Sequence, residues 1–165
     1  MENHYTLCVL VENRAGVLSK VVGLFSRRAF NIHSLSVGTT NDPTVSRITI
    51  EVIGSSETVE QISKQLSKLV DVIKIKVLTD DELVKRSLVL VKVRSSAGSR
   101  SEIIEIANIF RASIVDISPT TLTCELTGQS KKIDGFIELM EGFGIEEIAR
   151  TGVTALERGS KSLKL

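Results

Sequence analysis

This chain of 165 residues lacks most of the features that mark membrane proteins and nucleic-acid-binding proteins. It contains no run of about 18 apolar residues, so the sequence predicts no transmembrane helix. Its 21 basic and 20 acidic residues leave a formal net charge of +1. A charge this small gives no electrostatic reason to expect nucleic acid or an anionic membrane as a partner.

Residues that do chemistry are also scarce. His4 and His33 are the only histidines, they lie far apart in the sequence, and no carboxylate or cysteine stands at ligand spacing from either. Cys8 and Cys124 each fall inside an apolar strand pattern, which favours buried free thiols in a reducing cytoplasm over a disulfide or a nucleophile. Neither a Walker motif nor a complete dinucleotide-binding loop is present. The sequence therefore predicts a cytoplasmic protein with no catalytic residues, metal or cofactor of its own.

Apolar residues in the first half recur with the two periods that distinguish strands from helices. Alternation predicts four strands, and spacings of three and four residues predict a helix that buries positions from Leu18 to Ala29 and another that starts near Ser55 or Ser56. The predicted strands are Tyr5–Glu12, Ile32–Gly38, Val45–Ile53 and Ile73–Val77. The order βαββαβ is that of the ferredoxin-like fold, an antiparallel four-stranded sheet with two helices on one face.

The second half repeats this order. Thr79–Ser87 is polar and charged and is interpreted as a linker with a helical turn around Glu82. Ser99 with Glu102 predicts a capping box at one helix start, and Ser130 is the predicted cap of the next helix. Strands are predicted at 88–93, 114–118, 122–127 and 145–151, with a frayed basic tail from Ala155. The sequence thus predicts an α+β protein with two ferredoxin-like βαββαβ domains, residues 1–78 and 88–165, joined by the linker 79–87.

Several strands are apolar on both faces, although the helices of this fold cover only one. In the first strand, Cys8 and Leu10 point away from the face that carries Leu7 and Val9. Apolar residues on the second face need a cover, which another subunit or the other half of the chain would supply. We therefore expect a homodimer.

The segment 13–18, Asn-Arg-Ala-Gly-Val-Leu, lies where the first strand gives way to the first helix. The first N–H groups of a helix have no partner within the helix, and its dipole favours an anion beside them. Gly16 lacks a Cβ and lets a ligand approach the backbone, and Asn13 can cap the helix or bind a polar group. Two interpretations stay open: a tight turn, or a site for a carboxylate, with that of a small amino acid as the best candidate.

RNA binding is a competing interpretation, because the RNA-recognition domain shares the βαββαβ order. That domain stacks bases on aromatic side chains of its central strands. Here Tyr5 is the only aromatic residue in the two corresponding strands, and aromatic residues make up only 4% of the chain. The missing stacking surface argues against RNA.

Residues 13–18 together with Phe25–Ile32 resemble the start of an ACT domain, a small amino-acid-sensing module. The more specific resemblance is to the regulatory small subunit of acetolactate synthase, and it covers essentially the whole chain. In the second half it is carried by the segments 109–112 (IFRA), 125–128 (ELTG), 149–152 (ARTG) and 156–159 (LERG). Ala15 stands where the family often has proline, and Ala29 where it often has glycine.

The resemblance implies a regulatory function. In that family a catalytic large subunit uses thiamine diphosphate, Mg²⁺ and usually FAD to condense pyruvate with pyruvate or 2-oxobutyrate in branched-chain amino-acid synthesis. The small subunit activates the large subunit and confers feedback inhibition, typically by valine. The alternative is an ACT-domain amino-acid sensor that serves another biosynthetic enzyme or regulator.

The resemblance also implies where the effector binds, between the ACT domains of a homodimer. The expected contacts from one copy are Asn13, Ala15, Gly16, Val17 and Leu18, and those from the other copy are Asn31 and Ile32. The turn's N–H groups and the Asn13 side chain would hold the carboxylate. Asn31 or nearby carbonyls would bind the ammonium, and Leu18 and Ile32 would line the side-chain pocket.

Overall fold

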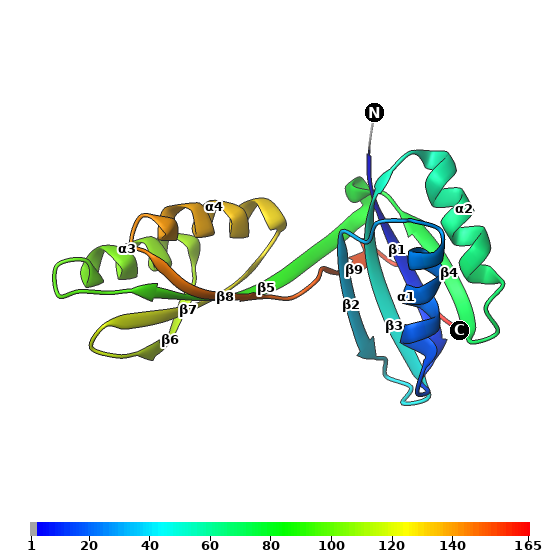
Figure 1. The fold of residues 1–165 in the computed structure, drawn as a ribbon, viewed down its shortest axis with the longest axis horizontal. Helices are drawn as coiled ribbons and strands as arrows, with labels where there is room; N and C mark the ends of the chain where they lie inside the picture. Colours follow the sequence, from blue (N-terminus) through cyan, green and yellow to red (C-terminus); the bar gives the residue numbers. More distant parts are fainter. Residues whose placement is uncertain (1–2) are drawn as a thin grey trace. The chain divides into compact units, whose positions relative to one another are not determined.

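The computed structural model describes residues 3–165, so Met1 and Glu2 of the predicted domain 1–78 lie outside the described residues. The chain forms two compact units, one that runs to Val84 and also includes Gly152–Leu165, and one that spans Lys85–Thr151. Figure 1 shows the elements in chain order from blue to red. These are β1 (Asn3–Glu12), α1 (Val17–Arg27), β2 (Ser34–Thr39), β3 (Val45–Gly54), α2 (Ser56–Ser67), β4 (Val72–Leu78), the 3-10 helix η1 (Asp80–Glu82), β5 (Leu83–Arg94), α3 (Arg100–Phe110), β6 (Ser113–Ile117), β7 (Thr121–Gly128), α4 (Ser130–Glu141), β8 (Ile145–Arg150) and β9 (Thr154–Glu157).

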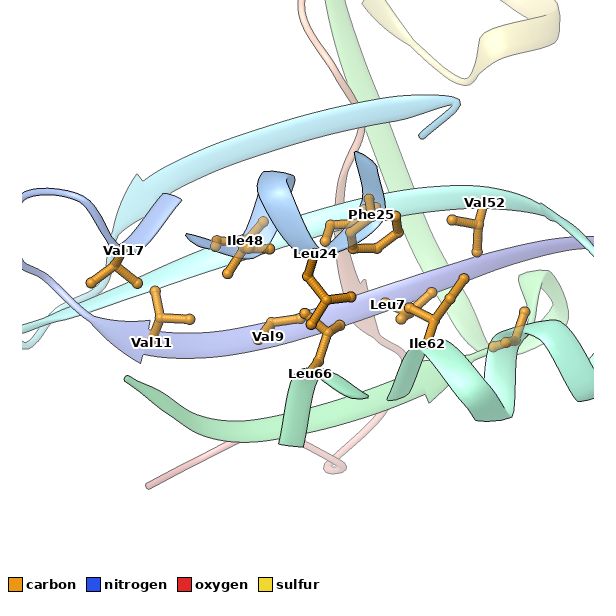
Figure 2. Packing of buried hydrophobic residues seen from close by; sticks show 13 residues of the cluster. Leu7, Val9, Val11, Val17, Leu24, Phe25, Ile48, Val52, Ile62 and Leu66 are labelled. Carbon is orange, nitrogen blue, oxygen red and sulfur yellow. The ribbon is translucent and has the colours of Figure 1, made fainter. Parts of the chain in front are cut away.

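In the first unit, β1 is a central strand of an antiparallel sheet with the order β2-β3-β1-β4. Alternate residues of β1 face α1 and α2, which lie on the same side of the sheet (Figure 1). Figure 2 shows Leu24 and Phe25 of α1 and Leu66 of α2 turned toward Val9 and Ile48 of the sheet. Full burial of one such side chain stabilises the fold by about 1.5–3 kcal/mol. This arrangement confirms the predicted ferredoxin-like fold.

The second unit repeats the topology with the strand order β6-β7-β5-β8. Strand β5 begins in the first unit, to which β9, its further partner, also belongs. Val91 of β5, Ile103 of α3 and Phe136 of α4 are completely buried in its core. Two βαββαβ units of α+β class are therefore present, as the sequence predicted.

The helix starts depart from the sequence-based prediction in three places. Val17 is buried whereas Leu18 is 40% exposed, so the inner face of α1 begins one residue earlier than predicted. Ser99 is the N-cap residue of α3 as predicted, but its side chain makes no capping hydrogen bond; its Oγ accepts a hydrogen bond from the Ser96 N–H at 3.0 Å. Gln129, not Ser130, is the N-cap of α4. Helix α2 starts at Ser56 as predicted, and its N-cap residue is Ser55, whose Oγ accepts a hydrogen bond from the Thr58 N–H at 3.2 Å.

The segments predicted as a linker and a frayed tail are structured. Residues 79–87 contain η1 and the start of β5, and residues 154–157 form β9. The prediction placed all of 88–165 in one domain, whereas Gly152–Leu165 belongs to the first compact unit. The physical reason is a third buried cluster, in which Ala155 of β9 and Leu83 pack against Cys8 and Leu78.

This C-terminal segment covers the face of the first sheet that has no helices. Cys8 and Leu10 point to that face and are only 0% and 3% exposed. Arg47 Nη2 donates a hydrogen bond to the Ala155 carbonyl at 2.7 Å, and Lys76 Nζ donates one to Glu157 at 2.8 Å. The cover expected from another subunit or from the other half of the chain thus comes, for this face, from residues 152–165 of the same chain.

Candidate functional site

The 13–18 turn presents the start of α1 without a side-chain cap. Asn13 is committed elsewhere: its N–H donates to the Thr44 carbonyl and its Nδ2 to the Pro43 carbonyl, each at 2.8 Å. Gly16 is the N-cap residue and has the left-handed dihedrals φ 85° and ψ −10°. Within the described chain no side-chain oxygen bonds to the first N–H groups of α1. The tight-turn interpretation is therefore correct for the local backbone, but Asn13 ties the turn to the β2–β3 loop and does not cap the helix.

The space beside Gly16 is open. A Cβ built on this residue would have no atom within 4 Å among the described residues. On either side, Ala15 is exposed and Val17 is buried, and the Val17 N–H donates to the Arg14 carbonyl at 3.4 Å. Leu18 is 40% exposed and supplies an apolar surface beside the turn. Free N–H groups, an open space and an apolar side chain fit a small amphipathic anion.

Two cations, one within the turn and one just after it, bind the same buried carboxylate. Arg14 Nη2 donates to Asp71 Oδ1 at 2.5 Å, and Lys20 Nζ donates to Asp71 Oδ2 at 2.8 Å. The hydrogen bond from Lys20, with that from Arg14, lowers the pKa of Asp71 below its ordinary value, so it is ionised at neutral pH. Two positive charges and one negative charge leave +1 beside the positive end of the helix dipole, which also favours an anion.

Asn31 and Ile32 lie beyond the other end of α1. This helix has 11 residues, which separates its ends by about 16 Å. Asn31 is exposed and lines a cavity of about 500 Å³ with Phe30, Ser55 and Thr58, while Ile32 is half-buried against the core. Within one chain the structure therefore brings Asn13–Leu18 together but does not bring Asn31 and Ile32 to them.

Sequence reasoning missed Asp71. It lies between α2 and β4, 57 and 51 residues from its partners Arg14 and Lys20. Pairing over that separation produces no periodic pattern, so no signal in a single sequence points to it. A lone acidic residue just before an apolar strand was the only hint.

The two histidines, far apart in the sequence, are neighbours in the structure. The ring centroids of His4 and His33 lie 5.7 Å apart in an edge-to-face arrangement. They meet because His4 pairs with Ile53 of β3 and the His33 N–H bonds to Glu51 of the same strand. Among residues 3–165 no group of three or more histidine, cysteine, aspartate or glutamate residues has the geometry to hold a metal ion.

The two cysteines are free and buried, as the strand pattern predicted. Burial raises the pKa of both thiols, and for Cys8 the nearby Arg47 partly opposes that shift. Neither thiol has the depressed pKa of a reactive cysteine. No helix in the described part of the chain is long and apolar enough to cross a membrane.

Comparison with known families accounts for both units. Residues 7–74 match the family described as the AHAS small subunit-like ACT domain. Residues 86–159 match the family described as the small subunit of acetolactate synthase. The fold and the open turn of the first unit therefore define an ACT domain, the regulatory module that the sequence resembles.

Similarity to individual proteins extends over the full chain. The probable acetolactate synthase small subunit of Methanothermobacter thermautotrophicus is 51% identical over 160 residues, which cover 96% of this chain and 95% of that protein. The acetolactate synthase small subunit of Haemophilus influenzae is 51% identical and covers 95% of this chain and 97% of its own length. The crystal structure of the small subunit from Thermotoga maritima superposes with a TM-score of 0.91 at 40% identity, over 96% of this chain and 99% of that one. The chain belongs to the acetolactate synthase small-subunit family.

Proposed function

We propose that this chain activates the catalytic subunit of acetolactate synthase and makes the holoenzyme sensitive to feedback inhibition by valine. The proposal rests on full-length similarity to proteins named small subunits of that enzyme. The structural observation that supports an anionic effector is the uncapped start of α1 beside the open space at Gly16. The large subunit is the protein partner, and thiamine diphosphate, Mg²⁺ and FAD belong to that subunit in this proposal.

The effector site in this proposal is shared between two copies of the chain. One copy contributes the effector turn, as we now call residues 13–18, and the second contributes Asn31 and Ile32. Because Asn31 and Ile32 lie at the opposite end of α1, a ligand that touches both sets of residues needs a second copy. Valine held this way bridges two subunits, and its differential contacts with two packing arrangements are what allosteric control requires.

In this proposal each residue of the effector turn has its own role. The N–H groups of Ala15 and Gly16 would face the carboxylate, whereas the Val17 N–H already donates to the Arg14 carbonyl at 3.4 Å. The Nδ2 of Asn13 already donates to Pro43, and its second amide hydrogen is the one left for the ligand. Leu18, rather than Val17, offers the apolar contact for the side chain.

The energies of these contacts match a sensor of a metabolite pool. Burial of the valine side chain contributes about 1.5–3 kcal/mol. A carboxylate at a helix start adds about 0.3–2 kcal/mol. A few such terms reach the roughly 4–8 kcal/mol of millimolar to micromolar binding.

Reconstitution of the holoenzyme tests the proposal. Acetolactate formation by the large subunit of the same organism is measured alone, with this chain, and with this chain and L-valine. We expect this chain to raise the rate and valine to lower it again. A rate that does not respond to this chain, or an activated rate that does not respond to valine, contradicts the corresponding half of the proposal.

A further inference from the structure

Asp71 is the buried member of a three-residue ionic cluster. Its side chain is 6% exposed, whereas those of Arg14 and Lys20 are 63% and 61% exposed. Both carboxylate oxygens are used, one by each cation, at 2.5 and 2.8 Å. A carboxylate with both oxygens in charge-assisted hydrogen bonds is held in one orientation.

Asp71 forms hydrogen bonds with a residue before the effector turn, a residue within it and a residue after it. The Asp71 carbonyl accepts a hydrogen bond from the Glu12 N–H at 2.9 Å, at the last residue of β1. Arg14 belongs to the turn itself, and Lys20 lies in the first turn of α1. Both ends of the segment that carries the free N–H groups are therefore anchored to a single residue.

The second unit shows that the fold itself does not need this carboxylate. At the equivalent point the Arg94 N–H, at the last residue of β5, donates to the Gly144 carbonyl at 2.8 Å. The backbone bond is conserved between the two units, but the residue that provides it in the second unit has no side chain. The Asp71 carboxylate is thus an addition that is specific to the unit with the effector turn.

We propose that Asp71 is a positioning residue for the effector, because it fixes the effector turn in the conformation that presents its N–H groups. This inference rests on the proposed function. Asp71 itself does not touch the ligand; it acts through Arg14, Lys20 and the backbone of the turn.

The direction in which Asp71→Asn changes valine affinity distinguishes a positioning role from simple charge attraction. The cluster carries a net charge of +1, and Asp71→Asn raises it to +2. If charge alone attracted the effector carboxylate, this substitution would tighten valine binding. If Asp71 positions the turn, the same substitution weakens binding although the site becomes more positive.

The test is calorimetric titration of the full chain with L-valine. We expect Asp71→Asn to weaken binding about tenfold or more, a clear change on the affinity scale. The double variant Asp71→Asn with Lys20→Gln restores the net charge of +1 and should bind as weakly. Glu157→Gln is the matched control, since Glu157 is also nearly buried, with a side chain 3% exposed, and pairs with Lys76 away from the turn; its affinity should stay within about twofold of the wild type.

Circular dichroism at the assay temperature establishes that each variant is folded. Arg14 and Lys20 are exposed, so Asp71→Asn leaves no buried charge unpaired and the chain should fold. If it does not fold, valine affinity is measured instead for Lys20→Gln, with Lys76→Gln as the control. We expect only the Lys20 variant to bind valine more weakly, and to do so at both low and high salt.

Each outcome has a distinct meaning. Unchanged or tighter binding by Asp71→Asn, or binding restored in the double variant, overturns the inference about Asp71 alone. For the Lys20 variant, an unchanged affinity for valine, or a loss of affinity that disappears at high salt, also overturns the inference about Asp71 alone. A wild-type chain that does not bind valine overturns the proposed function, and this inference with it.

Discussion

Gly16 meets two requirements that other residues do not meet together. Its φ of 85° lies in the left-handed region, where a side chain costs about 1–2 kcal/mol. It also leaves open space where an effector carboxylate would lie. The sequence revealed this position because glycine at a strand-to-helix junction is informative by itself, whereas Asp71 depends on partners that are distant in the sequence.

Gly16→Asp should abolish valine inhibition of the reconstituted holoenzyme, because it places bulk and negative charge in the carboxylate site. Gly16→Ala is the control, since it carries the same backbone strain without the charge. We expect the alanine variant to keep measurable inhibition at higher valine concentration. Inhibition curves of the two variants that coincide with the wild-type curve would rule out the carboxylate site at this turn.

Ala29 carries a strain that glycine would remove. It has a φ of 54°, and the N–H groups of Ala29 and Phe30 donate to the carbonyls of Ser26 and Phe25, the Schellman pattern that ends a helix. We expect Ala29→Gly to raise the free energy of unfolding by about 0.5–1 kcal/mol, the left-handed penalty less the added entropy of the unfolded chain. Urea unfolding measures this change, with Ala15→Gly as a control that should lower stability. A less stable Ala29→Gly variant would contradict the assigned backbone conformation.

At the scale of elements, the long strands and helices were predictable and the C-terminal segment was not. In β1, apolar residues recur at every second position from Tyr5 to Val11, which could be read from the sequence, whereas β9 has four residues and only Ala155 is buried. Its position depends on long-range contacts with Cys8 and Leu78, which leave no periodic signal. The same long-range packing explains why residues 152–165, predicted as part of a domain 88–165, belong to the first compact unit.

Gly152 should be essential for this C-terminal segment to dock. A Cβ at this position would clash with the Leu35 carbonyl oxygen, a backbone atom that cannot move aside. We expect Gly152→Ala to lower the free energy of unfolding by about 1–3 kcal/mol, as overpacking does. Gly38→Ala is the control, because a Cβ there meets no described atom within 4 Å, and it should change stability by less than about 0.5 kcal/mol.

Thiol labelling detects directly whether the C-terminal segment leaves its place over Cys8. Ala155 packs over Cys8 in the first unit, while Cys124 is buried in the core of the second. In Gly152→Ala, mass spectrometry should find Cys8 labelled faster than in the wild type and Cys124 unchanged. Equal labelling of Cys8 in the two proteins would show that the segment does not depend on Gly152.

At the scale of the whole molecule, the fold follows from periodicity but the function does not. The βαββαβ order is shared with RNA-binding domains, and only the residues of particular motifs, such as 13–18 and 25–32, separate the interpretations. The family was therefore recognisable from motifs, and full-length similarity to small subunits shows it directly. How two copies would complete the proposed effector site depends on an interface that no single-chain pattern specifies.

The most direct test of this account is a crystal structure of the chain grown with L-valine. We predict valine between two copies, with its carboxylate on the N–H groups of Ala15 and Gly16 of one copy and its ammonium near Asn31 of the other. An effector turn left empty at saturating valine, or valine bound entirely within one chain, would contradict the account.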